Sequence, residues 1–248
     1  MTYSANLGFL WTELPLPAAI RAAKRAGFAA VECHWPYDVP AAEVAQAMAA
    51  TGLPMLGLNT ARGETFGLSA LPGQEGAARA AIDQAVAYAR AVNCRAIHVM
   101  AGKTEGPAAD AAFAANLRYA SALAPEKTLL IEPLNARDVP GYYLGTTTKA
   151  RAIIDHLALP NLKIMFDCYH VQISEGDLTR RLSDLLPLIG HVQIAAVPSR
   201  AEPDRGEVDY RHILGHLTNL GWTIPIGAEY RPAGTTEQGL GWMERLRI

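Results

Sequence analysis

The chain has few cysteines, no excess of positive charge and no nucleotide-binding glycine motif. Its three cysteines, Cys33, Cys94 and Cys168, form no C-x-x-C pair, which argues against a disulfide framework and for a reducing compartment. The formal net charge of −2 over 248 residues provides no overall attraction for nucleic acid or for an acidic membrane. We therefore expect a small-molecule substrate and no nucleic-acid partner.

Long apolar runs are absent as well. No segment holds the ~18 uninterrupted apolar residues that a membrane-spanning helix needs. The amino-terminal stretch MTYSANLGFLWTELP has no basic segment and is broken by Glu13 and Pro15, so it resembles neither a signal peptide nor an anchor. These features predict a cytoplasmic protein without a membrane partner, and they leave the choice between a monomer and a homo-oligomer open.

The sequence instead alternates short apolar runs with Ala-rich segments of helical period, which is typical of βαβ units around a parallel sheet. Strands are expected at 3–7, 29–33, 55–59, 95–100, 128–132, 162–167, 191–194 and 224–229. Helices are expected near 15–26, 40–51, 75–92, 109–123, 147–157, 177–187, 209–220 and 236–245. Eight such units, 50% hydrophobic residues and no G-x-G-x-x-G after the first strand predict a single-domain α/β fold, a (β/α)₈ TIM barrel over 1–248.

Local signals support these boundaries. Gly27, Gly52 and Gly221 follow three of the expected helices, where a left-handed residue commonly ends a helix. The threonines at 146–148 can cap the helix that begins near 147, and Asp209 can cap the helix that begins near 209.

Four expected strands in the second half of the chain end on an oxygen-bearing side chain: Glu132, Asp167, Gln193 and Glu229. Their separations of 35, 26 and 36 residues each correspond to about one βα unit. The carboxyl ends of barrel strands form the active-site face, so the four side chains should meet there. A single such acid is more often a helix cap or a surface ion-pair partner. Four in succession predict a site for a hard cation, Mg²⁺ or Mn²⁺.

Several longer blocks carry a family resemblance. These are SANLGF, IEPLNARDVPGYYL, NLKIMFDCYHVQISEGDL, IGHVQIAAVPSRAEPDRGEVDY and IGAEYRP. They resemble the hydroxypyruvate isomerase family of xylose isomerase-like barrels, which includes 2-oxo-tetronate isomerases. The resemblance implies that Glu132 and Glu229 are the acid/base pair as well as metal ligands, and that Asp167 and Gln193 complete the metal site. Related ketose 3-epimerases usually carry His where Gln193 stands, which counts against an epimerase.

The chemistry can also be argued from the residues. Isomerising a 2-keto-3-hydroxy compound moves a proton between adjacent carbons, and two glutamates on separated strands can remove it and return it. His170 and Arg200 are the candidate substrate-binding residues, because a guanidinium can grip a carboxylate through two hydrogen bonds. Competing interpretations make His170 a loop-packing residue and pair Arg200 with Glu202 or Glu207.

Other polar and aromatic residues near the strand ends are weaker candidates. Arg231 is a second candidate clamp or a surface ion-pair partner, His98 a hydrogen-bonded core residue, and His191 a partner behind the ligands. Four aromatic residues can either wall the pocket or serve subunit contacts at the barrel mouth: Phe9, Trp11, Trp35 and Tyr37.

The sequence thus predicts a metal-dependent isomerase of carbohydrate metabolism that acts on a small keto acid. It would convert hydroxypyruvate to tartronate semialdehyde, or 2-oxo-tetronate to 3-oxo-tetronate. The alternative is a 3-epimerase of neutral ketoses with the same metal site. An abasic-site endonuclease would need more histidine ligands and a basic groove, and a non-catalytic binding module would not need two opposed glutamates.

Overall fold

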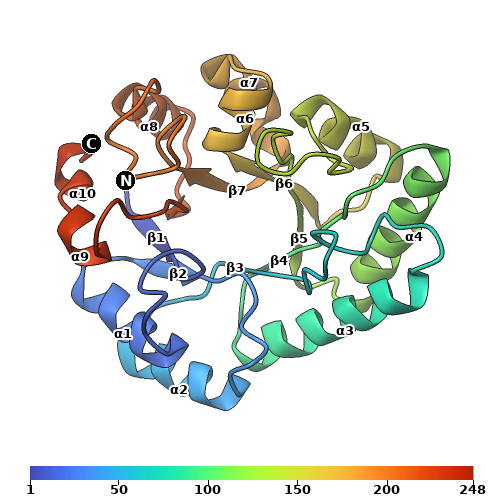
Figure 1. Ribbon diagram of the computed structural model, residues 1–248, viewed down its shortest axis with the longest axis horizontal. Coiled ribbons are helices and arrows are strands. Elements are labelled where there is room, and N and C mark those ends of the chain that lie inside the picture. Colours follow the sequence, from blue (N-terminus) through green and yellow to red (C-terminus); the bar gives the residue numbers. More distant parts are fainter. Residues whose placement is uncertain (248) are drawn as a thin grey trace.

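The computed structural model describes residues 1–247 and shows eight parallel strands closed into a barrel (Figure 1). The strands are β1 (Tyr3–Asn6), β2 (Ala30–Glu32), β3 (Gly57–Asn59), β4 (Ala96–His98), β5 (Thr128–Ile131), β6 (Leu162–Asp167), β7 (Ile189–Ile194) and β8 (Ile226–Ala228). Their order is β2-β1-β8-β7-β6-β5-β4-β3, and a parallel bridge between Val31 and Met55 joins β2 to β3. The predicted TIM barrel is confirmed.

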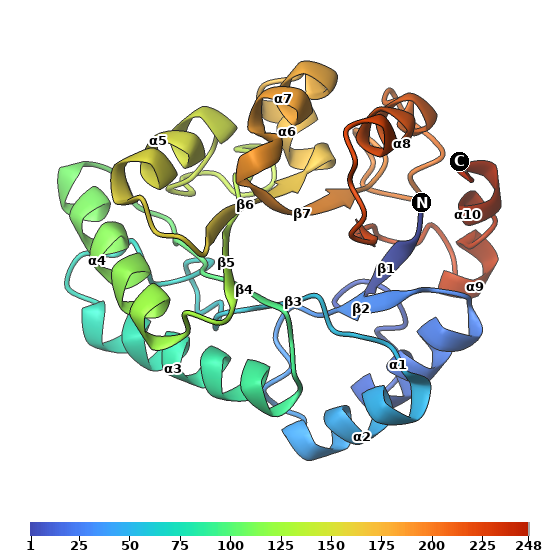
Figure 2. The ribbon, with the colours of Figure 1, turned by 180° about the vertical axis from the view of Figure 1, so that it is seen from behind.

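Helices cover the outside of the barrel (Figures 1 and 2). They are α1 (Leu16–Arg25), α2 (Ala41–Thr51), α3 (Glu75–Ala91), α4 (Pro107–Leu123), α5 (Thr147–Leu157), α6 (Cys168–Ser174), α7 (Leu178–Leu185), the 3₁₀ turn η1 (Leu186–Leu188), α8 (Tyr210–Asn219), α9 (Thr236–Gly239) and α10 (Trp242–Arg245). None of the helices within 1–247 is long and apolar enough to cross a bilayer.

The predicted helix signals hold. Thr146 and Asp209 cap α5 and α8 through their side-chain oxygens, and Gly27, Gly52 and Gly221 have φ of 89°, 69° and 83°. Two segments differ from expectation. The segment after β6 is the helix α6 rather than a loop, because the Asp167 carboxylate accepts a hydrogen bond from the Tyr169 N–H and starts a helix at once. The last expected helix divides into α9 and α10 near two glycines, which are poor helix formers.

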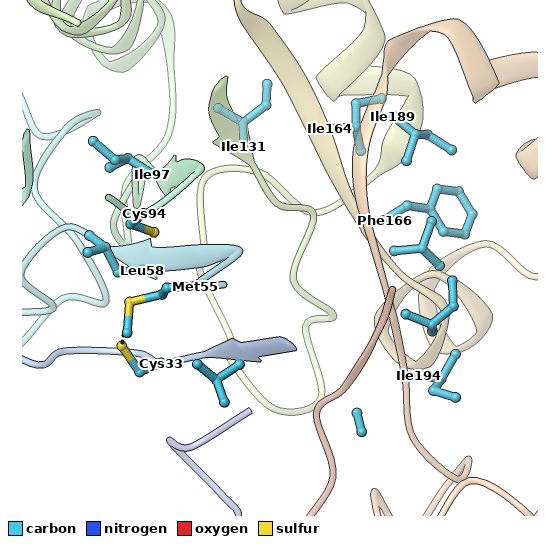
Figure 3. Close-up of a cluster of buried hydrophobic side chains, with 14 of the residues drawn as sticks. Cys33, Met55, Leu58, Cys94, Ile97, Ile131, Ile164, Phe166, Ile189 and Ile194 are labelled. Carbon is cyan, nitrogen blue, oxygen red and sulfur yellow. Dashed lines mark hydrogen bonds between the residues drawn. The ribbon is translucent and has the colours of Figure 1, made fainter. Parts of the chain in front are cut away.

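Strand alternation separates two apolar layers. The side chains that face the helices belong to one large buried cluster, part of which is shown in Figure 3. A second small cluster consists of Ala96, Leu130 and Met165. Leu130 and Met165 lie two residues before Glu132 and Asp167, so both acids share the strand face of this inner cluster. The predicted ligands therefore point into the barrel rather than toward the helices.

Candidate metal centre and active site

The four predicted metal ligands lie together at the carboxyl end of the barrel. Asp167 is the last residue of β6 and pairs in register with Gln193 of β7. Glu132 directly follows β5 and Glu229 directly follows β8. All four side chains are buried. The strand ends thus bring residues separated by up to 97 positions (229 minus 132) to one place.

Each of these side chains leaves one buried oxygen without a hydrogen-bond partner in the described chain: Glu132 Oε1, Asp167 Oδ2, Gln193 Oε1 and Glu229 Oε2. A buried acceptor without a partner costs about 1–3 kcal/mol, so four in one place require a compensating ligand. Donor atoms of Glu132, Asp167 and His170 lie within 4.8 Å of one another, and Glu229 does not belong to this mutually close group. Three carboxylates and an amide fit a hard cation such as Mg²⁺ or Mn²⁺.

The crowded carboxylates have shifted pKa values. Burial and the nearby charges of Glu229 and Asp167 raise the pKa of Glu132 well above its usual range. Burial and Glu229 raise the pKa of Asp167 to about 7. Burial also acts to raise the pKa of Glu229, but a hydrogen bond from His34 and the charge of Arg200 outweigh it and lower that pKa to about 2. A divalent cation held by these oxygens would offset their mutual repulsion.

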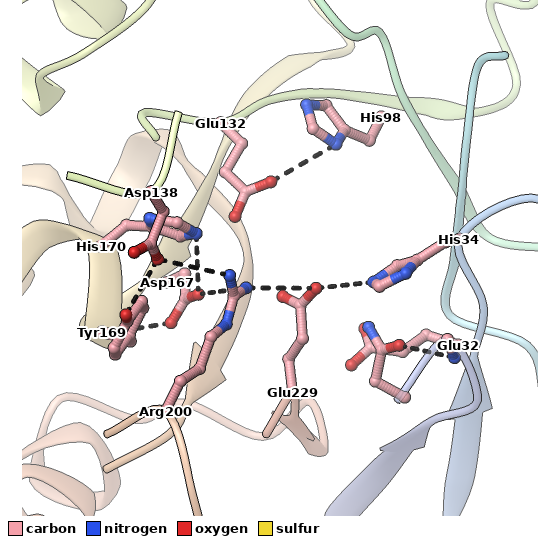
Figure 4. Close-up of polar contacts among 12 residues, drawn as sticks. Glu32, His34, His98, Glu132, Asp138, Asp167, Tyr169, His170, Arg200 and Glu229 are labelled. Carbon is pink, nitrogen blue, oxygen red and sulfur yellow. Dashed lines mark hydrogen bonds and ion pairs between the residues drawn. The ribbon is translucent and has the colours of Figure 1, made fainter. Parts of the chain in front are cut away.

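His170 lies on α6 and faces the same centre (Figure 4). Its Nδ1 accepts hydrogen bonds from the backbone N–H and the side-chain amide of Asn135, at 3.1 and 2.7 Å. Nε2 therefore carries the proton of the neutral ring, and it lies 3.7 Å from Asp167 Oδ2. Burial lowers the pKa of His170 to about 3, so the ring is neutral near pH 7. Its Nε2–H is placed to donate to an oxygen at the centre rather than to bind a cation.

Arg200 extends from the loop after β7 into the centre of the site (Figure 4). Its guanidinium nitrogens lie 3.8 Å from Asp138, 3.7 Å from Asp167 and 3.6 Å from Glu229. The guanidinium carbon is 5.0 Å from the ring centre of Phe9 and 4.9 Å from that of Tyr169. The structure therefore places Arg200 among the candidate ligands, away from the alternative partners Glu202 and Glu207.

His34 is a site residue that the sequence argument missed. Its Nε2 lies 2.7 Å from Glu229 Oε1, and its ring contacts those of Phe9 and Trp35 edge-on or tilted. The available signal was the alternation E-x-H at the end of β2, which turns Glu32 and His34 to the same face. Asp138 was also missed, and it lies in a loop where no period identifies an inward side chain.

Two other histidines occupy the barrel interior. His98 is buried as expected, but it is not a hydrogen-bonded core residue, because neither ring nitrogen has a partner in the described chain. Its Nδ1 lies 3.5 Å from Glu132 Oε2, and burial lowers its pKa to about 4. His191 hydrogen-bonds Glu32 through Nε2 at 2.5 Å. A Cβ on Gly227 would lie 2.4 Å from Glu32 Oε1 and 2.8 Å from His191 Nε2, so glycine leaves room for this pair.

A cavity of about 250 Å³ opens onto the site. Phe9 and Trp35 line it, as do three arginines: Arg62, Arg200 and Arg231. Two other aromatic residues predicted for the wall lie elsewhere. Trp11 is buried and donates to Glu237, and the Tyr37 hydroxyl donates to the Asn59 carbonyl. The indole N–H of Trp11 and the hydroxyl of Tyr37 are both hydrogen-bonded within the fold, and neither ring lines the cavity.

Comparison with known proteins decides the family. The family model described as a xylose isomerase-like TIM barrel matches residues 20–246. The chain belongs to the xylose isomerase-like TIM barrel family. The 2-oxo-tetronate isomerase of Cupriavidus necator is 41% identical over 252 residues, which cover 98% of this chain and 97% of the relative. The hydroxypyruvate isomerase of Escherichia coli K12 is 36% identical over 257 residues, which cover 100% of both.

A solved structure shares the fold of this chain. The crystal structure described as AP endonuclease, family 2 from Brucella melitensis has a TM-score of 0.95 and 38% identity, and the match covers 100% of both chains. The resemblance of the sequence blocks to the hydroxypyruvate isomerase family is confirmed. The chain is therefore an enzyme of the isomerase class that acts on a small molecule.

Proposed function

We propose that this isomerase converts hydroxypyruvate to tartronate semialdehyde, or the four-carbon 2-oxo-tetronate to 3-oxo-tetronate, in the cytoplasm and with Mg²⁺ or Mn²⁺ as cofactor. The observation that carries the proposal is the set of four buried oxygens on Glu132, Asp167, Gln193 and Glu229 that have no hydrogen-bond partner within residues 1–247. Two of the full-length relatives bear the names of these activities. The cavity of about 250 Å³ lies below the ~300–1,000 Å³ of drug-sized pockets, which suits an acid of few carbons.

The proposed reaction moves one carbon-bound proton. It leaves C3 of hydroxypyruvate and returns at C2, while a hydroxyl proton passes from O3 to O2, so that an enediolate lies between substrate and product. Glu132 and Glu229 follow β5 and β8, three strands apart around the ring, and reach the substrate from different sides. One glutamate removes the proton and the other returns it, a contribution of about 10²–10⁴-fold.

The remaining residues bind and orient the substrate. His170 Nε2–H and the Arg200 guanidinium donate to substrate oxygens, and His34 holds the Glu229 carboxylate through its 2.7 Å contact. A divalent cation bound by the four ligands would supply Lewis-acid stabilisation of the negative charge that develops on the two substrate oxygens. Phe9 and Trp35 keep water from the reacting carbons.

Proton NMR of hydroxypyruvate in D₂O tests this proposal, with one sample loaded with Mg²⁺ and a second treated with EDTA. We expect loss of the C3 proton signal and appearance of tartronate semialdehyde in the loaded sample alone. Exchange at C3 without a new product would support the acid/base pair and direct the search to four-carbon 2-oxo acids. The absence of exchange in both samples would overturn the assignment to hydroxypyruvate, and epimerisation of neutral ketoses, the alternative function, would be assayed next.

A further inference from the structure

Three arginines line the cavity, and within residues 1–247 only Arg200 has carboxylates within ion-pair distance. Arg200 lies within 4.0 Å of three carboxylates. A substrate carboxylate beside it would therefore meet more negative than positive charge. Within residues 1–247, neither Arg62 nor Arg231 has a carboxylate within ion-pair distance, although both are exposed at the cavity wall. A substrate that carries a carboxylate needs such a cation.

Arg62 is the better supported of the two. Its guanidinium carbon lies 3.9 Å from the ring centre of Phe66 and 5.6 Å from that of Trp35. Stacking covers one face of the planar guanidinium and leaves its N–H edge free for bidentate recognition of a carboxylate. Arg231 lies 5.4 Å from the ring of Phe9, so its guanidinium is less closely supported.

The loop between β3 and α3 holds Arg62 and Phe66 in this arrangement. The Arg62 carbonyl accepts a hydrogen bond from the Gly67 N–H at 2.5 Å, and the Thr65 hydroxyl donates to the Gly67 carbonyl at 2.7 Å. Phe66 has φ of 58°, a left-handed conformation that bulky residues avoid and that is concentrated at functional sites. Gly67 has φ of 115°, and a Cβ there would lie 2.4 Å from the Met100 carbonyl oxygen.

Arg62 lines the same cavity as Glu132 and Glu229. The Trp35 ring, 5.6 Å from the Arg62 guanidinium, lies 5.0 Å from the His34 ring between centres. His34 in turn contacts Glu229 at 2.7 Å. A substrate held in this cavity therefore lies between walls that carry the glutamates and a wall that carries Arg62.

We propose that Arg62, stacked on Phe66, binds the substrate carboxylate and makes this isomerase select 2-keto acids over neutral ketoses. The inference rests on the proposed function, since it assumes a keto-acid substrate. Arg200, in the loop after β7, then binds the substrate oxygens near the candidate ligands. The loop between β3 and α3, which carries Arg62, recognises the carboxylate. The Lys103 ammonium, 5.1 Å from the centre of the Phe66 ring, adds positive charge to the same loop region.

The test compares Arg62→Gln with Arg62→Lys and Arg231→Gln. Arg79→Gln is the matched control, because Arg79 is exposed and stacks at 5.0 Å on Tyr119 outside the cavity. Each variant is assayed in D₂O on hydroxypyruvate and on dihydroxyacetone, in which a hydroxymethyl group replaces the carboxylate. Titration with pyruvate gives a dissociation constant that needs no turnover.

For Arg62→Gln we expect the KM for hydroxypyruvate and the Kd for pyruvate to rise about 10- to 100-fold, the range of a lost hydrogen bond to a charged group. The kcat and the exchange of dihydroxyacetone should change less than about threefold. In Arg62→Lys the KM and Kd should rise less than in Arg62→Gln. Lysine keeps the positive charge and loses only the two parallel N–H donors of the guanidinium. Arg79→Gln should behave like the unaltered enzyme.

Three results would overturn the inference. The first is an unchanged KM and Kd in Arg62→Gln. The second is an equal loss of activity on hydroxypyruvate and on dihydroxyacetone in that variant. The third is a loss of activity on hydroxypyruvate alone in Arg231→Gln and not in Arg62→Gln. In these cases the unaltered enzyme still isomerises a keto acid, so the proposed function stands. If the unaltered enzyme exchanges the C3 proton of no three-carbon or four-carbon 2-keto acid, both proposals fail.

Discussion

Replacing Glu229 with glutamine separates the chemistry of this site from its stability. The side chain is buried, and the amide keeps its size and an oxygen that can accept from His34. The substitution loses a charge-assisted contact worth about 1.5–3 kcal/mol. It also removes a charge that raises the pKa values of Glu132 and Asp167. Because these effects oppose each other, we expect a net change below about 1 kcal/mol, which is ~2–4 °C in Tm for a chain of this size.

The effect on turnover should be much larger. Loss of a general acid or base costs about 10²–10⁴-fold, which is ~2.7–5.4 kcal/mol of transition-state stabilisation at 1.36 kcal/mol per decade. Thermal unfolding by circular dichroism and C3 exchange of hydroxypyruvate by NMR measure the two quantities on the same preparation. Glu126→Gln is the control, because it removes the same charge at an exposed position paired with Arg90. Near-normal exchange in a folded Glu229→Gln variant would remove Glu229 from its proposed role.

Three further predictions concern other parts of the molecule. Saturating Mg²⁺ at about 100 times its Kd should stabilise the protein by ~2.7 kcal/mol. Gln193→Leu, which removes one proposed ligand, should reduce the Tm shift that Mg²⁺ causes in differential scanning calorimetry. An equal shift would exclude Gln193 as a ligand. Thr146→Ala should lower the free energy of unfolding in urea by ~1 kcal/mol through loss of the α5 cap, with kcat unchanged. Leu130→Ala, which leaves a cavity in the inner cluster, should cost about 2–5 kcal/mol by the same measurement; a cost below about 1 kcal/mol would show that the barrel interior collapses around it.

The fold and the candidate ligands were predictable because both depend on periodic features. Strand and helix periods repeat eight times along the chain, and the barrel places the carboxyl ends of all eight strands on one face. The position of a residue at a strand end therefore follows from the strand pattern alone. Glu132, Asp167, Gln193 and Glu229 could be grouped by this rule, and the structure places all four at the carboxyl ends of β5 to β8.

The rest of the site depends on loops, for which the sequence contains no period. The positions of Arg200 and Asp138 follow from chain paths that hydrogen bonds within each loop determine. The helix α6 was missed because one side chain, Asp167, is both a candidate ligand and a cap. Its Oδ1 accepts a hydrogen bond from the Tyr169 N–H, and its Oδ2 has no hydrogen-bond partner in the described chain. A pattern of residue types does not show which of two oxygens serves which purpose.

This division of Asp167 shows how the barrel can tolerate so much buried negative charge at one end. One oxygen of Asp167 contributes to the start of α6, and one oxygen of Glu229 accepts from His34. Each carboxylate is thus oriented by a contact that leaves its second oxygen directed at the centre. These hydrogen bonds fix the orientation of the two carboxylates. The buried oxygens without a hydrogen-bond partner in the described chain destabilise the fold when no ligand is bound. Removal of the proposed cation should therefore lower the stability of the site more than mutation of any single orienting partner, because four acceptors then lack a partner in place of one.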